Sequence, residues 1–297
     1  MRSHLIIISV FLLCCSCHNR SNKEGGEITA VSDMSLELEL PEVPEELVRP
    51  EERAQFVALH FWDDLDFSRD QRALDTAFVE QNFVNFIDLL PYVPQESAGE
   101  AVAKLLDKAA ENREAASLLS WVTERYLDDP NSPMRSEELY ILFLQHISES
   151  EKAEEGERER ADYRLRQAMK NRPGSKGADF RMLTRDGGTL TLMEGVRNDT
   201  TLVMFYDPDC SQCKEFTPQL IASETAKRFK VLAVDVATDK GLWDSTKDKF
   251  PADWTVGFAL DPVDDEGIYV LPALPSVYLM APDGTVILKD ININAIQ

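Results

Sequence analysis

The sequence is poor in cysteine and histidine, and the positions of these residues limit its chemistry. Three of the five cysteines fall within the first 17 residues, which leaves Cys210 and Cys213 as the one later pair. No histidine lies beyond His146, so a zinc site built on this pair would lack its other ligands and is disfavoured. Such sparse use of cysteine argues against a framework of structural disulfides.

Basic residues are also in short supply. Lysine and arginine number 31 against 53 aspartates and glutamates, which gives a formal net charge of −22. A chain this acidic repels the phosphates of nucleic acid and of anionic lipid, so neither is an expected partner. The simplest interpretation of the acidity is solubility in a secreted protein, and discrimination among partners by charge is the alternative.

The chain lacks a hydrophobic run long enough to span a bilayer, although its first residues are apolar. Leu5–Leu13 is too short to cross a membrane and follows a positively charged start. The small residues and cysteines after it resemble a bacterial lipoprotein signal. That resemblance implies cleavage before Cys17, lipidation of Cys17, and a lipid anchor that places the protein in the bacterial cell envelope, facing the periplasm. Lipidation at Cys14 or Cys15, or a plain secretory signal, are the alternatives.

Composition and periodicity predict four segments. Residues 1–17 form the signal peptide, and residues 18–45 are polar, acidic and broken by glycine and proline, as in a flexible tether. Residues 46–170 form a helical domain and residues 171–297 a second domain, separated by the break Asn171–Gly177. Within the tether, apolar residues alternate over Leu36–Leu40, which predicts either a strand or a docked segment.

The helical domain shows apolar residues at intervals of three and four, without strand signals. We expect an antiparallel bundle or a repeat-like array in which Trp62 and Trp121 are core or boundary residues, and Tyr163, Leu165 and Met169 face inward. This half resembles an uncharacterised helical domain that precedes thioredoxin folds in some envelope lipoproteins. The expected helices begin near Pro50 and cover residues 70–90, 100–112, 114–126, 136–149 and the charged stretch up to 170.

The second domain centres on the stretch Thr201–Pro218. An apolar run predicts a buried strand, a short turn follows, and Cys210 then begins a helix expected over residues 212–230. The free N–H groups and the dipole of that helix favour a thiolate at its start, and Cys213 lies one turn further along. The carboxylates of Asp207 and Asp209 oppose this effect.

This stretch resembles the thioredoxin superfamily, in particular the TlpA/ResA-like thiol-disulfide oxidoreductases of Gram-negative envelopes. The resemblance rests on the two cysteines, on Pro218 five residues after Cys213, on the strand 231–236 and on Pro275. It implies a thioredoxin-like α/β fold with a central mixed sheet flanked by helices. The whole chain is therefore expected to be an α+β protein of two domains, with an N-terminal all-α helical domain before the thioredoxin-like one.

The same resemblance assigns the reacting groups. Cys210 is the expected nucleophile and Cys213 the resolving thiol. Met204 occupies the strand position where thioredoxins often bury an acidic proton acceptor, so no proton relay is expected from that position.

Substrate contacts are expected on both sides of the pair. The resemblance places a cis peptide bond between Leu274 and Pro275, facing the cysteines and able to pair with a bound polypeptide. Pro272 competes for this role. Asp209 and Ser211 flank Cys210 and complete the predicted substrate-binding residues.

These features predict an enzyme that exchanges or reduces disulfides of proteins outside the cytoplasm. The resemblance implies protein disulfide substrates and a membrane-bound electron donor, and no cofactor or metal is expected. A non-catalytic lipoprotein, whose helical domain binds a partner while the thioredoxin fold serves as scaffold, is the alternative. A peroxiredoxin-like peroxidase is less favoured, because Asp207 stands where such enzymes carry threonine. The sequence leaves the direction of electron flow open.

Overall fold

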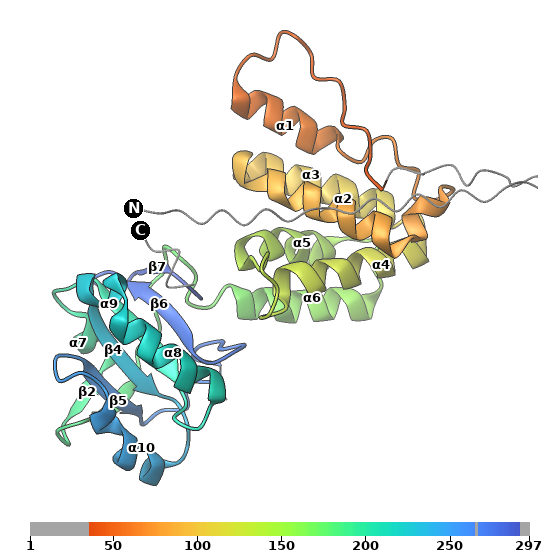
Figure 1. Ribbon diagram of the computed structural model, residues 1–297. Helices are drawn as coiled ribbons and strands as arrows, with labels where there is room; N and C mark the ends of the chain where they lie inside the picture. The colour runs from red at the N-terminus through yellow and green to blue at the C-terminus, as the bar shows by residue number, and fades with distance from the viewer. Residues whose placement is uncertain (1–35, 265–266, 292–297) are drawn as a thin grey trace, which may run out of the picture. The chain divides into compact units, whose positions relative to one another are not determined.

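The computed structural model describes residues 36–264 and 267–291 (Figure 1). Cys17, the predicted signal peptide and the tether up to residue 35 lie outside the described residues. In the described part, the six α-helices between Pro50 and Ala168 precede all strands, which lie between Arg181 and Leu288. We call residues 36–171 the helical region and residues 172–291 the sheet region. The division of the chain into two domains stays a prediction.

The helical region contains six α-helices close to the predicted ranges, and capping residues mark where three of them begin. Asp75, Asn112 and Ser136 each accept a backbone N–H from the first turn of the helix that they precede, which explains where those helices begin. The elements are α1 (Pro50–His60), α2 (Thr76–Leu89), α3 (Gln95–Ala109), α4 (Arg113–Thr123), α5 (Glu137–Glu149) and α6 (Glu155–Ala168), with short turns η1 (Gln71–Leu74), η2 (Leu90–Tyr92) and η3 (Glu124–Asp128).

These helices pack around one apolar core. Trp62 is buried there as expected, whereas Trp121 stays 46% exposed with the Arg125 guanidinium over its ring. The prediction that Tyr163 and Met169 face inward is wrong, because they are 58% and 45% exposed. The highly charged α6 buries only alanines among its described residues, and small side chains let it lie close to its neighbours. In the described part of the chain, no helix has the length and apolarity needed to cross a membrane.

The segment Leu36–Leu40 is docked and does not form a strand. The buried Asn82 of α2 accepts the N–H of Leu38 at 2.8 Å and donates its amide to the carbonyl of Leu36 at 2.9 Å. The Leu38 side chain is buried, while Leu36 and Leu40 remain exposed. One amide side chain thus satisfies the backbone of a segment that has no neighbouring strand. This part of the predicted tether is held against α2.

The sheet region contains a mixed sheet of seven strands in the order β2-β1-β5-β4-β3-β6-β7. The three central strands β3, β4 and β5 are parallel, and the outer strands pair antiparallel. This mixed sheet flanked by helices confirms the predicted α/β architecture. The strands are β1 (Arg181–Thr184), β2 (Thr189–Thr191), β3 (Thr201–Tyr206), β4 (Lys230–Asp235), β5 (Thr255–Ala259), β6 (Ser276–Met280) and β7 (Val286–Leu288).

Apolar side chains cover both faces of the sheet, which explains why β3 is buried along its whole length. On one face, α8 (Ser211–Ala222) packs Cys213 and Leu220 against Leu202 and Met204. The helix predicted over residues 212–230 is broken, because Ser223 ends α8 and caps α9 (Glu224–Arg228) through its hydroxyl. The remaining helices are α7 (Leu192–Val196), α10 (Lys240–Thr246) and the short turn η4 (Lys247–Lys249).

Candidate active site

Cys210 lies where β3 passes into α8, at the N-cap position of the helix. Its Sγ accepts the backbone N–H of Cys213 at 3.2 Å, so one of the free amides at the helix start points at the sulfur. Cys210 is half-buried and Cys213 is buried, and both are free thiols. The sequence-predicted pair therefore meets at a helix N-terminus, with the first thiol nearer to solvent.

The two thiols differ in how readily they ionise. Burial and, to a smaller extent, its hydrogen bond with Cys210 together raise the pKa of the Cys213 thiol to about 12. A thiol in this environment is protonated at neutral pH and is a poor nucleophile. Cys210 contributes part of this rise in the pKa of Cys213, so the pKa of Cys213 changes when the Cys210 sulfur is bonded to another group.

The loop before β6 brings a second predicted feature to the cysteines. The Leu274–Pro275 peptide bond is cis, as the resemblance implied, and the Cys210 thiol donates to the Leu274 carbonyl at 3.4 Å. The register of the sheet explains this proximity, because Ser276 at the start of β6 pairs with Phe205 near the end of β3. Leu274 and Pro275 are both partly buried. The backbone on the N-terminal side of Pro275 thus forms one wall of the site.

Asp209 and Ser211 are exposed at the start of α8. The Asp209 carboxylate pairs with the Lys214 ammonium at 2.9 Å, and this hydrogen bond lowers the pKa of the Asp209 carboxyl. Because Lys214 compensates the charge, Asp209 opposes a Cys210 thiolate less than the sequence suggested. Both residues remain predicted substrate contacts.

A cavity of about 320 Å³ opens beside Cys213. Its wall is mostly apolar and comes from the end of β3, one side of α8 and the segment around Phe250. The lining residues are Tyr206, Asp207, Pro208, Cys213, Lys214, Thr217, Pro218, Ile221, Thr246, Lys249 and Phe250.

A buried carboxyl lies at the same end of the sheet, and the sequence reasoning missed it. Asp235 ends β4 next to Tyr206 and has no exposed surface, and one of its oxygens has no hydrogen-bond partner within residues 36–264 and 267–291. Burial raises the pKa of Asp235 to about 7, and the nearby carboxylates of Asp207 and Asp239 add to this effect. The sequence does contain a sign of this carboxyl, because Asp235 is an acidic residue at the end of an apolar run that predicts a parallel strand. The carboxyl ends of parallel strands lie at the same edge of a sheet, so Asp235 could have been placed near the end of β3.

Tyr206 stands between this carboxyl and the cysteines. Its hydroxyl is buried without a hydrogen-bond partner among the described residues, and its ring lines the cavity beside Cys213. Burial and the neighbouring Asp235 raise the pKa of Tyr206 far above its usual value. Met204, at the strand position discussed above, is fully buried among apolar side chains. The acid near this site therefore comes from β4 and not from β3.

Residues 16–171, just over half of the chain, match a family described as a domain of unknown function (DUF5106). A thioredoxin-like protein from Bacteroides caccae is 32% identical, with a TM-score of 0.79, over 87% of this chain and 95% of its own. The chain belongs to the DUF5106 family and is thioredoxin-like. Within the described residues of this thioredoxin-like protein, no three His, Cys, Asp or Glu side chains are grouped to hold a metal.

Two other solved structures match shorter parts of this thioredoxin-like protein. The C-terminal domain of an uncharacterized Bacteroides fragilis protein is 29% identical, covering 42% of this chain and 94% of its own, with a TM-score of 0.39. A putative thiol:disulfide interchange protein DsbE from Chlorobium tepidum is 26% identical, covering 40% and 85%, with a TM-score of 0.34. No curated protein matches the chain.

Proposed function

We propose that this protein is a thiol-disulfide oxidoreductase that reduces or exchanges disulfides of proteins outside the cytoplasm. The observation that supports this most directly is the position of Cys210. Its sulfur accepts a helix N-terminal amide and lies 3.4 Å from the carbonyl that precedes Pro275. This arrangement leaves room at a half-buried sulfur for a second sulfur to approach, beside a backbone segment able to bind an extended chain.

In the proposed reaction, the Cys210 thiolate attacks one sulfur of a substrate disulfide. The substrate S–S bond breaks, a mixed disulfide forms, and the other substrate sulfur leaves as a thiolate that takes a proton. Cys213 then loses its proton and attacks the Cys210 sulfur, which releases the second substrate thiol. The substrate gains two electrons and the cysteine pair loses two, so a donor dithiol must reduce the pair again.

The environment of Cys213 fits the second step. The hydrogen bond and the charge of Cys210 both raise the pKa of Cys213 while Cys210 is free. Once Cys210 is bonded to substrate it carries no negative charge, so that part of the opposition to a Cys213 thiolate disappears. The resolving thiol is thus protonated before substrate binds and becomes easier to ionise afterwards.

We also propose that the protein acts at the bacterial cell envelope, through a lipid on Cys17, and receives electrons from a membrane-bound donor. The support for this is the N-terminal sequence pattern, which lies outside the described residues. Globomycin treatment of cells, which blocks removal of lipoprotein signals, should shift the protein to its precursor mass, and a Cys17→Ser variant should be released from the membrane fraction.

The catalytic proposal is tested by insulin reduction with dithiothreitol as electron donor. The full chain should accelerate precipitation of the insulin B chain, and Cys210→Ser should abolish this activity. A Cys213→Ala variant should instead accumulate mixed disulfides that can be isolated from cells and identified. A Cys210→Ser variant as active as the unaltered protein, or no activity in either, would leave the scaffold alternative. Peroxide consumption that depends on Cys210 would favour the peroxidase.

A further inference from the structure

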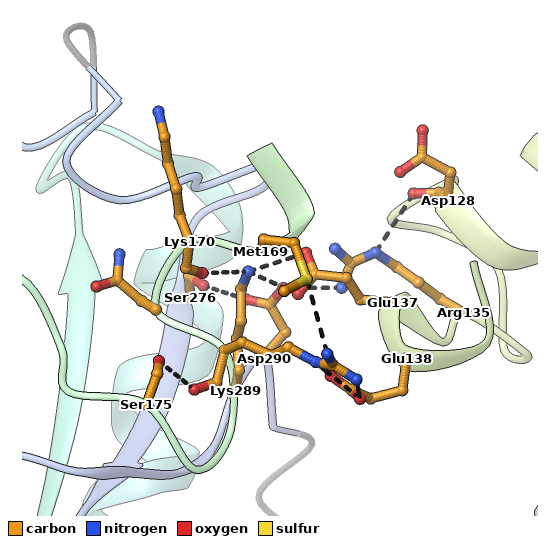
Figure 2. Close-up of polar contacts among 12 residues, drawn as sticks. Asp128, Arg135, Glu137, Glu138, Met169, Lys170, Ser175, Ser276, Lys289 and Asp290 are labelled. Atoms are coloured by element: carbon orange, nitrogen blue, oxygen red, sulfur yellow. Dashed lines mark hydrogen bonds and ion pairs between the residues drawn. The ribbon is translucent and has the colours of Figure 1, made fainter. Parts of the chain in front are cut away.

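The helical region meets the sheet region through ion pairs at the start of α5. Arg135 pairs with Asp290 at 2.9 Å, and Glu137 pairs with Lys289 at 2.6 Å (Figure 2). Asp290 and Lys289 follow β7, the edge strand next to β6. Two adjacent residues of the sheet region are therefore held by two nearly adjacent residues of the helical region.

These pairs are shielded from water. The exposed fractions are 18% for the Arg135 side chain, 13% for Asp290, 17% for Glu137 and 4% for Lys289. Charges in such positions are tolerated only where further hydrogen bonds satisfy them. Lys289 also donates to the Lys170 carbonyl at 3.2 Å, as Figure 2 shows. The contact is thus a polar network shielded from water and differs from solvent-exposed ion pairs, which contribute little stability.

Asp290 connects this network to the candidate active site. One of its oxygens receives the Arg135 guanidinium, and the other accepts the hydroxyl of the buried Ser276 at 2.5 Å. Ser276 directly follows Pro275, and Leu274 carries the carbonyl that receives the Cys210 thiol. A continuous series of bonds therefore runs from Arg135, just before α5 of the helical region, to the nucleophilic sulfur.

The backbone at Asp290 supports a specific role for this residue. Its φ is 52°, a left-handed conformation that aspartate adopts more readily than most residues with a side chain. The neighbouring amide of Ile291 donates to the Val277 carbonyl at 3.0 Å, which ties the same turn to β6. The turn is held in this conformation by bonds to β6 on one side and to Arg135 on the other.

We infer that Arg135 is a positioning residue for the thiol-disulfide site, and that it acts through Asp290 and Ser276 on the Leu274–Pro275 segment. The inference rests on the function proposed above. Without Arg135, the Asp290 carboxylate would be poorly solvated and would turn toward water, so Ser276 would lose a fixed partner. If the Leu274–Pro275 segment moves relative to the Cys210 sulfur, we expect it to bind an extended polypeptide less well.

The chain offers a matched control in Arg172, which pairs with Glu138 of α5 at 2.5 Å and is not among the hydrogen-bond or ion-pair partners of Asp290 in the described residues. Arg135→Met should raise the KM for insulin about tenfold in full-length protein, with less than twofold change in the rate of Cys210 alkylation. Arg172→Met should leave the KM unchanged. Arg135→Lys keeps the charge and should restore much of the lost affinity.

Hydrogen exchange of the peptide covering residues 274–280 gives a readout that does not depend on activity. Arg135→Met should accelerate exchange in this peptide, and Arg172→Met should not. Equal effects of both variants on KM and exchange, or no effect of Arg135→Met on either, would overturn the inference. Inactive unaltered protein would contradict the proposed function, and the exchange comparison would still decide whether Arg135 positions the segment.

Discussion

The helical region and the sheet region each bury a polar side chain, Asn82 and Asp235, and these two differ in how fully they are hydrogen-bonded. In the helical region, the buried Asn82 uses its amide fully, with bonds to Leu38, Leu36 and Phe78. In the sheet region, Asp235 and Cys213 are equally buried, and both can change protonation near neutral or alkaline pH. A fully bonded amide holds the chain in place, whereas a buried group that is incompletely bonded weakens the fold and retains reactivity. The difference distinguishes a structural core from a chemical site.

The sharpest test of this comparison is the reactivity of the two thiols. With its pKa near 12, about 1 in 10⁴ Cys213 side chains is ionised at pH 8, so alkylation at that pH should modify Cys210 alone. Cys213 should react measurably faster with each unit of pH up to about 12. Peptide mass spectrometry after timed iodoacetamide treatment measures both rates.

Urea-unfolded protein is the control, because there both thiols should react at similar rates. Rapid modification of Cys213 in the folded protein at pH 8 would show that it is not shielded, and the contrast with the helical region would then be lost.

The next largest effect is expected from Asp235→Asn. The folded protein holds a proton on Asp235 up to a pKa of about 7, whereas the unfolded chain loses it near pH 4, so stability falls as pH rises through this range. Asparagine can still accept the Ala237 amide and cannot ionise. The variant should therefore be more stable above pH 7, by on the order of 4 kcal/mol, with little difference below pH 4.

Urea unfolding at pH 4, 6 and 8 measures this difference. The exposed Asp248, also in the sheet region, supplies the control, and Asp248→Asn should change the free energy of unfolding little at any of these pH values. A stability of Asp235→Asn that runs parallel to that of the unaltered protein would contradict the assignment.

Asn82→Ala tests whether the fully bonded amide in the helical region holds the chain in place. It removes the bonds to Leu36 and Leu38 and leaves buried backbone groups without partners, so it should destabilise the protein by about 2 kcal/mol. It should also free residues 36–40 for limited proteolysis. Asn85, on the same helix and bonded to Gln81, is the matched control. If Asn85→Ala exposes the segment equally, Asn82 has no special role in docking it.

The smallest effect is expected at Trp121, an exposed aromatic of the helical region. Its contact with the Arg125 guanidinium is solvent-accessible, so Trp121→Ala should lower the free energy of unfolding by less than about 1 kcal/mol. Thermal unfolding in low and high salt measures it. A much larger loss would show that this surface is covered in the full-length protein.

The sequence was sufficient to predict those parts of the site that are formed by residues close together along the chain. The apolar run of β3, the cysteines at the following helix start and Pro275 before β6 are each recognisable within a few residues. The cis bond and the α/β architecture were expected from them and are present. The helix break at Ser223 was missed, because serine is a mild helix breaker and acts here as a cap.

The groups that were missed depend on contacts between distant residues. Asp235 approaches Tyr206 only because β4 pairs parallel to β3, and Arg135 reaches a residue 155 positions away. The helix prediction placed Tyr163 inward from its spacing alone, but α6 packs through alanines and leaves that face to solvent. Periodicity states which residues share a face and does not state whether another element covers it.

The docking of Leu36–Leu40 on α2 sets how far the folded protein can travel from an anchor. Leu36 lies 19 positions after Cys17, and a fully extended chain covers about 3.5 Å per residue. A lipid on Cys17 would therefore confine the point of docking to within roughly 65 Å of the membrane surface. Disulfides within that distance would meet the protein at a high local concentration, and those of freely diffusing proteins further away would not.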